Sequence, residues 1–405
     1  MNDPARLAAV AVFAATYVGL ALGRLPGLRI DRAGIALVGA SLMLATGTLR
    51  LAGVARAIDS DTLALLLGMM IVVANLRLSG FFRLVTGWIV AAARRPLALL
   101  IAVTVASGLF SAFLLNDAIC LVMTPLVIEV ARRLGRDPVP YLLAVAMAAN
   151  IGSAATITGN PQNILIGSFS RIPYGIFAAH LAPLAALGLA ATVVLIALLH
   201  RAEFRGGALL DARPAPAHLH RPLAIKSVVV VLLMMAAFFA GEPPATVALV
   251  AGAVMLLTRI VAAQRIYREI DWPLLLMFAG LFVVVAGFER AALRSAALPA
   301  IAAAGLGRPW ELIAATAALS NLVSNVPAVL VLQPFVAHLA APGRTWLIVA
   351  MAATFAGNLT VLGSVANLIV VQLARADSIH IGFWHHFRVG APLTLLTLAL
   401  GLWWL

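Results

Sequence analysis

Apolar residues run along this chain in long stretches separated by short polar segments, as in proteins whose helices cross a membrane. An apolar run of about 20 residues can cross the hydrocarbon core as a helix, and we interpret ten runs as such spans. Five lie in each half, at 7–23, 33–49, 62–79, 141–167 and 175–199, and at 226–241, 245–258, 272–288, 345–373 and 385–405. The pattern predicts an all-α polytopic membrane protein.

Each half contains one more apolar stretch between its third and fourth spans, at 97–131 and at 309–339. Polar residues interrupt both stretches near the middle, around Asn116 and Asn325. Irregular backbone at membrane depth survives only where protein or a cavity shelters it. We therefore predict that each stretch is a re-entrant hairpin with its polar tip inside the membrane.

The two halves repeat the same polar motifs. At a spacing of 209 residues, Ser111, Asn116 and Pro125 match Ser320, Asn325 and Pro334. At a spacing of 204 residues, Thr156, Gly159 and Asn163 match Thr360, Gly363 and Asn367. A weaker match pairs Asp61 with Asp271 at a spacing of 210. Polar, helix-breaking residues at corresponding positions of two hydrophobic halves are the best sequence indication of a transporter's binding site.

Five spans per half is an odd number, so the second half enters the membrane from the opposite side to the first. The sequence thus predicts an inverted repeat, with residues 1–199 as the first copy and 227–405 as the second. A basic, Pro-rich segment at 200–226 is the expected cytoplasmic linker. The spans at 141–167 and 345–373, which carry the second motif, are expected to be broken helices.

Composition and charge agree with this interpretation and assign the faces. Apolar residues are 63% of the chain and charged residues 11%, far from the proportions of soluble domains. The net charge of +13 suggests nucleic acid binding at first, but all 28 basic residues lie in loops or at the ends of spans. Twenty lie in loops of one predicted face and eight in loops of the other. The positive-inside rule then predicts a multi-pass protein of the bacterial inner membrane with both termini outside, and no nucleic acid partner.

Asp117 is the acidic residue predicted to lie deepest in the membrane, at the tip of the first hairpin. A charged side chain at that depth costs at least ~2.5 kcal/mol, which a structural role without a partner does not explain. One interpretation is a carboxylate that binds the coupling proton or sodium ion. The alternative is a helix N-cap, and the two roles can coexist.

Amides and small residues form the candidate substrate site. An amide offers both hydrogen-bond donors and an acceptor, and each broken helix would point a half-helix N-terminus, which carries partial positive charge, at the midplane. The alternative for any one of them is that it merely joins helices. The candidates are Asn116, Thr156, Gly159, Asn160, Asn163, Ser324, Asn325, Asn358, Thr360, Gly363, Ser364 and Asn367.

The remaining polar residues give weaker signals. Cys120 is interpreted as a small buried apolar residue, and His218 and His220 as part of a solvated loop, because no further metal ligands accompany them. His385 and His386 are expected to anchor the chain at the membrane interface. No metal and no cofactor is predicted, apart from the coupling proton or sodium ion.

The paired motifs resemble those of the ion transporter superfamily, over essentially the whole chain. Within it, Asn116-Asp117 and Thr124-Pro125 of the first hairpin are similar to the arsenite permease and P-protein pattern, as are Asn325-Val326-Pro327 and the Gly159–Asn163 run. The resemblance implies a scaffold and a transport domain that holds two opposed hairpins and two unwound helices. It also implies that homodimers formed through the scaffold are common.

We therefore expect a secondary transporter of a small inorganic anion or oxyanion, with proton-coupled efflux of the arsenite type by alternating access. The alternatives are a sodium/proton antiporter and a sodium-coupled dicarboxylate or citrate symporter. The second would need the Ser-Asn-Thr tips that positions 117 and 326 lack. No nucleotide-binding loop or nucleophile–base pair indicates an enzyme, and a separate ATPase partner is left open.

Overall fold

The computed structural model describes residues 3–23, 27–92, 95–205, 219–293, 306–336, 339 and 341–405, and within them all regular structure is helical. The helices of the first half are α1 (Asp3–Leu22), α2 (Arg32–Ala45), α3 (Leu51–Ala57), α4 (Ser60–Leu78), α5 (Phe81–Ala92), α6 (Pro96–Phe113), α7 (Asn116–Arg133), α8 (Pro138–Ser153), η1 (Ile157–Gly159), α9 (Pro161–Ser170), α10 (Tyr174–Leu199) and α11 (Arg201–Phe204).

The second half repeats this order. Its helices are α12 (Arg221–Phe239), α13 (Pro244–Leu256), α14 (Ala263–Arg268), α15 (Trp272–Phe288), η2 (Glu289–Leu293), α17 (Pro309–Val323), α18 (Asn325–Val336), α19 (Pro342–Ala356), η3 (Val361–Gly363), α20 (Val365–Ala376) and α21 (Phe383–Trp404). The ten predicted spans correspond to α1, α2, α4, α8–α9, α10, α12, α13, α15, α19–α20 and α21. Within the described residues, seven helices are long and apolar enough to cross a membrane, namely α1, α4, α6, α10, α12, α15 and α21. Six of them are predicted spans, and α6 is the first arm of the first predicted hairpin. The helices α2 and α13 and the paired half-helices α8–α9 and α19–α20 make up the other four spans.

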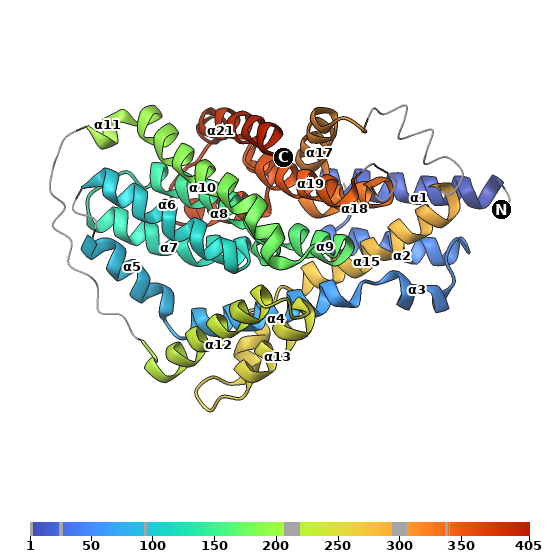
Figure 1. Cartoon of the computed structure of the whole chain (residues 1–405), viewed down its shortest axis with the longest axis horizontal. Coiled ribbons are helices and arrows are strands. Elements are labelled where there is room, and N and C mark those ends of the chain that lie inside the picture. The colour runs from blue at the N-terminus through green and yellow to red at the C-terminus, as the bar shows by residue number, and fades with distance from the viewer. Residues whose placement is uncertain are drawn as a thin grey trace.

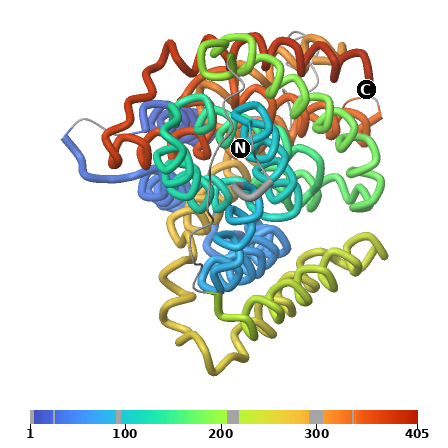
Figure 2. The backbone as a smooth tube through the Cα atoms, turned by 90° about the vertical axis from the view of Figure 1, so that its left-hand side faces the viewer, coloured from blue at the N-terminus to red at the C-terminus, as the bar shows by residue number. Residues whose placement is uncertain are grey.

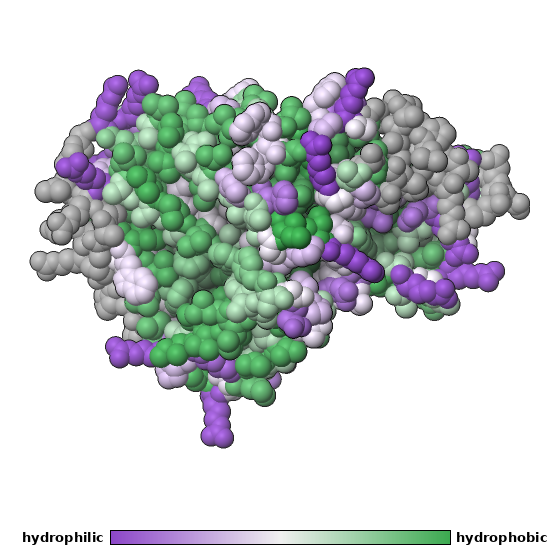
Figure 3. Space-filling model, in the orientation of Figure 1, coloured by the Kyte–Doolittle hydropathy of each residue, from purple (hydrophilic) through white to green (hydrophobic). Residues whose placement is uncertain are grey.

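Figure 1 shows the two halves interleaved, with α6, α7 and α8 at one end of the molecule and α1, α2 and α15 at the other. The α12–α13 pair projects from one side of the bundle in the turned view of Figure 2, and α13 packs against α4 there. Apolar side chains cover most of the face seen in Figure 3, and hydrophilic ones gather near its edges. Such a surface suits contact with lipid.

Two helix crossings, α4 with α13 and α15 with α2, occupy equivalent positions in the internal repeat. A Cβ atom on Gly68 of α4 would lie 2.3 Å from the carbonyl oxygen of Ala248 on α13, and one on Gly280 of α15 would lie 2.8 Å from the same atom of Ala36 on α2. Because no side chain fits at either crossing, the paired helices pack backbone against backbone. The two contacts are related by a spacing of 212 residues.

The same spacing corrects one sequence match. Asp59 accepts a hydrogen bond from the Thr62 amide at the start of α4, and Asp271 accepts one from the Leu274 amide at the start of α15. Both aspartates are N-caps, which satisfy amides that the first helical turn leaves free. Asp59, and not Asp61, is therefore the structural counterpart of Asp271.

Both re-entrant hairpins form as predicted. The first consists of α6 and α7 and reverses at Leu114 and Leu115, while the second consists of α17 and α18 and reverses at Ser324. Both tips lie beside a broken helix, since α8 gives way to α9 through the short helix η1 and α19 gives way to α20 through η3.

Polar contacts at the chain reversals agree with the grouping of loops that the charge count predicted. Three ion pairs join different loops of the basic face. They are Arg77–Glu269 at 2.5 Å, Arg132–Asp377 at 2.9 Å and Arg136–Glu203 at 2.7 Å. On the other face, the Asp59 carboxylate accepts a hydrogen bond from the Ser168 hydroxyl, and the Arg344 guanidinium donates to the carbonyl of the last residue, Leu405.

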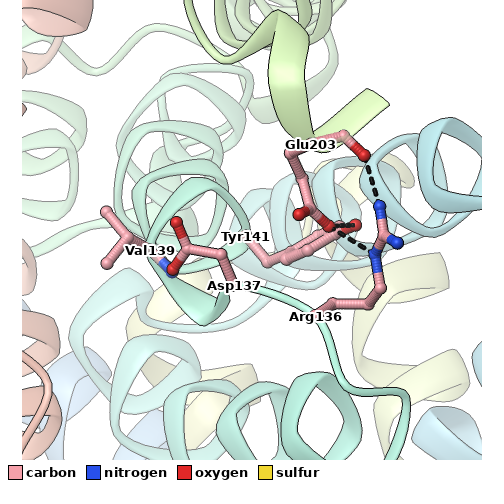
Figure 4. Close-up of polar contacts among 5 residues, drawn as sticks. All are labelled: Arg136, Asp137, Val139, Tyr141 and Glu203. Atoms are coloured by element: carbon pink, nitrogen blue, oxygen red, sulfur yellow. Dashed lines mark hydrogen bonds and ion pairs between the residues drawn. The ribbon is translucent and has the colours of Figure 1, made fainter. Parts of the chain in front are cut away.

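The beginning of the predicted linker packs against the base of the first hairpin (Figure 4). The Glu203 carboxylate on α11 accepts hydrogen bonds from Arg136 Nε at 2.7 Å and from the Tyr141 hydroxyl at 2.9 Å. Nearby, Asp137 caps α8 by accepting from the Val139 amide. Residues 206–218 of the linker, including His218, lie outside the described residues.

Candidate functional site

A cleft of about 590 Å³ lies where the two hairpin tips and the two broken helices meet. Its wall combines the end of α1, the start of α2, the start of α15, both hairpin tips, the start of α9, and α20 with the residues just before it. The polar and charged residues that line it are Asp31, Arg32, Asn116, Asp117, Gln162, Asp271, Asn321, Ser324, Asn325, Ser364 and Gln372.

Five of the predicted site residues line this cleft, namely Asn116, Asp117, Ser324, Asn325 and Ser364. The other eight, Thr156, Gly159, Asn160, Asn163, Asn358, Thr360, Gly363 and Asn367, do not line it. The structure thus separates the predicted set into residues that face the cleft and residues that shape its wall. Direct contact of any of them with substrate stays a prediction.

Asn116 connects the first hairpin tip to the opposite half of the molecule. Its side-chain nitrogen donates to Asn150 Oδ1 at 3.2 Å, and Asn150 in turn donates to Asn358 Oδ1 and Asn367 Oδ1, both at 2.9 Å. Ser364 also donates to Asn150 Oδ1. The Asn116 side-chain oxygen is buried and has no hydrogen-bond partner within the described residues. A buried acceptor of this kind is available to a donor on a bound solute.

Asn325 makes an equivalent connection from the second hairpin tip. The amide orientation that satisfies its neighbours is the one in which the nitrogen donates and the oxygen accepts. Its nitrogen then donates to the carbonyls of Gly363 at 3.1 Å and Ala353 at 3.2 Å, and its oxygen accepts from Gln162 Nε2 at 3.0 Å. Each tip therefore bonds the broken helix of its own half, and the network continues into the other half.

Two asparagines hold the broken helices open. Each donates from its side-chain nitrogen to two carbonyls of the unwound segment, which would otherwise lack partners. The bonds run from Asn163 to Ser153 (3.1 Å) and Thr156 (3.0 Å), and from Asn367 to Gly357 (2.8 Å) and Thr360 (3.1 Å). Their amides are thus engaged in maintaining the breaks.

The half-helices that follow the breaks begin with capped N-termini. Asn160 Oδ1 accepts from the Asn163 amide at 2.8 Å at the start of α9, and Ser364 Oγ accepts from the Ala366 amide at 3.2 Å at the start of α20. Both ends lie at the cleft, because Pro161 and Ser364 line it. Each supplies the partial positive charge that the sequence predicted at this depth.

Asp117 lies in the first turn of α7 and lines the cleft, but it does not cap the helix. The N-cap position is Leu115, and no side chain caps this helix. Within the described residues, the Asp117 carboxylate accepts no hydrogen bond and forms no ion pair, and it also lines a second, narrower cavity. The capping alternative is therefore wrong. The carboxylate lines the cleft, and its role in binding a proton or an ion stays a prediction.

The two hairpin tips are chemically unequal. The counterpart of Asp117 in the second tip is Val326, and the counterpart of Ser324 in the first is Leu115. Ser324 has φ of 76° and ψ of 162°, a region of backbone conformation almost confined to glycine. The first tip therefore contributes the charge, and the second contributes a strained hydroxyl-bearing turn.

This strain predicts a change in stability. We expect Ser324→Gly to raise the free energy of unfolding by about 1 kcal/mol, since glycine adopts positive φ without a steric cost. Ser324→Ala keeps the strain and loses only the hydroxyl, so it should not stabilise the fold. Thermal unfolding in detergent distinguishes the two, and equal unfolding temperatures would contradict the assignment of strain. Both variants lose the hydroxyl, so a transport defect shared by both would come from that group.

Sequence reasoning missed several residues of the network, among them Asn321, whose side chain bonds Ala356 and Thr360 at the second break. Asn150 lies in an apolar run, and its counterpart in the second half is Thr354, so comparison of the repeats hides it. Gln162 lies inside the recognised motif but has no polar counterpart. His386 was expected at the membrane interface, yet it is buried and its Nε2 bonds the Asn358 carbonyl at 3.0 Å. That prediction is wrong, because α21 packs against the second break and places the His386 ring there.

The other candidates lie away from the cleft or form no metal site. Cys120 is completely buried and does not line the cleft, in keeping with its interpretation as a small apolar residue. Within the described residues, no group of three His, Cys, Asp or Glu side chains could hold a metal ion.

Comparison with known proteins supports a transporter. A family model described as citrate transporter matches residues 17–356. An uncharacterized transporter of Mycobacterium tuberculosis is 32% identical over 97% of this chain and 96% of its own. A silicon efflux transporter of Oryza sativa subsp. japonica is 29% identical over 93% of each chain.

The fold also has a counterpart among solved structures. The crystal structure of the YdaH transporter of Alcanivorax borkumensis matches with a TM-score of 0.60 at 15% identity, over 99% of this chain and 97% of the other. These similarities confirm the resemblance to the ion transporter superfamily. The chain belongs to the citrate transporter family and is a multi-pass membrane transporter, not an enzyme.

Proposed function

We propose that the protein is a proton-coupled secondary transporter of a small hydroxylated inorganic solute of the arsenite type, which it moves out of the cell by alternating access. The observation that carries the proposal is the cleft itself. Both hairpin tips and both half-helix N-termini meet there, next to a carboxylate without a partner among the described residues. Such a midplane site between two inverted repeats is typical of secondary transporters.

The charges of the cleft favour an uncharged or weakly charged solute. Three carboxylates, those of Asp31, Asp117 and Asp271, line it together with one guanidinium, that of Arg32. A citrate trianion would meet a surplus of negative charge there. Arsenite and silicic acid are uncharged hydroxides near neutral pH, and their hydroxyl groups can donate to an amide oxygen such as that of Asn116. The similarity to a silicon efflux transporter agrees with this chemistry.

The orientation of the protein in the membrane follows from the face whose loops carry most of the basic residues, which we call the basic face. The cleft is lined by residues that adjoin loops of that face, such as Gly23, Asp31, Asp271 and Gln372. Under the positive-inside rule, this face is cytoplasmic in a bacterial inner membrane. We therefore assign the structure to an inward-open state, with both termini outside.

Transport into proteoliposomes tests the proposal. With a pH gradient and no sodium, we expect flux of arsenite or silicic acid and none of citrate or phosphate. The citrate transporter family model and Arg32 favour a second candidate, a citrate symporter. Citrate flux that appears only when sodium is added would establish that alternative and overturn the proposal. Sodium-dependent collapse of the pH gradient without any added solute would instead indicate a sodium/proton antiporter.

A further inference from the structure

A second cavity reaches Asp117 from the basic face without passing through the cleft. It has a volume of about 110 Å³, and apolar side chains of α4 and α7 form most of its wall, among them Val73, Ala74, Ala118 and Val122. The two cavities share Asp117, Pro161, Asp271, Leu274 and Ile369. They therefore meet at the two carboxylates.

The charged lining of the narrow cavity lies toward the surface. Arg77 and Glu269, which form an ion pair at 2.5 Å, both line it, and their side chains are 39% and 25% exposed. Within this cavity, Asp117 and Asp271 are the acidic groups outside that ion pair. Asp31 and Arg32 line the cleft and do not line the narrow cavity.

Asp271 is well placed to exchange protons with water. It is exposed, and Oδ1 accepts the capping hydrogen bond from the Leu274 amide at 3.0 Å. Its other oxygen accepts no hydrogen bond from the described residues. The narrow cavity can hold a few water molecules, since each takes up about 30 Å³ in the liquid. Its apolar wall offers few groups that would bind an inorganic solute.

We propose that Asp271 and the narrow cavity form a proton route between Asp117 and the basic face that is separate from the solute route through the cleft. In the inward-open state, protonated Asp117 gives its proton to water in the narrow cavity and becomes a carboxylate. The water passes the proton to the Asp271 carboxylate, which then releases it as a hydronium ion into the water of the basic face. The solute thus enters through the cleft while the proton leaves through the narrow cavity.

This inference rests on the proposed proton coupling at Asp117, and transport assays separate the two. Asp271→Asn removes the proton-binding group but keeps the helix cap, because asparagine caps as well as aspartate. Ala118→Leu and Ala74→Leu fill the narrow cavity from two different helices. The matched controls are Asp59→Asn, the equivalent cap on the opposite face, and Ala190→Leu, an exposed alanine of α10.

Two rates are measured in proteoliposomes that contain a pH-sensitive dye, with arsenite and silicic acid each offered as the solute. We expect Asp271→Asn and both filled variants to lose most of the pH-driven accumulation and the accompanying proton flux. Exchange of labelled for unlabelled solute at equal pH should continue, and both controls should behave as the wild type.

The outcomes distinguish failure of the separate proton route from failure of the proposed function. If Asp117→Asn uncouples transport but Asp271→Asn and the filled variants match the controls, the separate route is wrong and the proposed function stands. If exchange and coupled flux fall together in all three variants, the narrow cavity is structural and the separate route is again overturned. If the wild type moves no solute with protons, the proposed function itself fails.

Discussion

Asp117→Asn is expected to reduce proton-driven solute accumulation to the level of protein-free liposomes. The substitution keeps the shape of the side chain and removes its ability to bind and release a proton. Asp117 lines both cavities and, within the described part of the chain, has no hydrogen-bond or ion-pair partner. No local structure therefore depends on its charge. Exchange of solute at equal pH should stay within about threefold of the wild type, because the groups that bind the solute are unchanged.

The matched control is Asp61→Asn, which changes an exposed aspartate in the first turn of α4 on the opposite face. It should leave both accumulation and exchange unchanged. Full accumulation by Asp117→Asn would exclude this residue as the coupling group. Loss of exchange together with accumulation would mean that Asp117 binds the solute itself, and the site would then be better described as a solute clamp.

Gly152→Ala is expected to prevent stable folding. A Cβ atom at this position would lie 2.1 Å from the carbonyl oxygen of Gly108 and 2.5 Å from its Cα. Both atoms belong to the backbone of α6, so no side-chain rotation can relieve the clash. Separating α6 from α8 would also disturb the hairpin and the first break, since both end beside this crossing. We expect a loss of about 3 kcal/mol or more, at the upper end of overpacking effects.

Thermal unfolding and monodispersity in detergent measure this effect. Gly343→Ala serves as the control, because Gly343 is an exposed residue of α19 with no atom within 4 Å of an added Cβ. Alanine there should be neutral or slightly stabilising, by up to about 1 kcal/mol. A Gly152→Ala protein that unfolds at the wild-type temperature would show that α6 and α8 can separate freely, and the tight crossing would have no structural role.

The unequal hairpin tips bear on how an inverted repeat acquires a direction. The backbone of the site is nearly symmetric, with matched breaks, matched N-caps and matched amides that hold the breaks open. Its chemistry is not symmetric, since the carboxylate of one tip corresponds to an apolar residue at the equivalent position of the other tip. The repeat thus supplies two comparable hairpin tips, while the proposed coupling group, Asp117, belongs to the first hairpin alone.

The sequence alone determined the spans, the repeat, the tips of the hairpins and the places where two helices break. These features can be identified locally, because every backbone amide in a membrane must find its hydrogen-bond partner within the protein. An interruption of an apolar run therefore marks a place where protein or a cavity shelters the backbone. Asn116, Asn325, Asp117 and the broken helices were identified on this basis. The spans are apolar on all sides, however, so their periodicity does not reveal which face points inward.

The tertiary structure alone decided which polar side chains face the cleft and which maintain its wall. An asparagine inside the membrane can bind a solute or satisfy a broken backbone, and the residue type is the same in both cases. Packing separates the two cases, since Asn163 and Asn367 donate to unwound carbonyls away from the cleft while Asn116 lines the cleft. Asn150, Gln162 and Asp271 join the site because helices distant in sequence bring them there. Such contacts depend on the three-dimensional arrangement of helices, which no local pattern encodes.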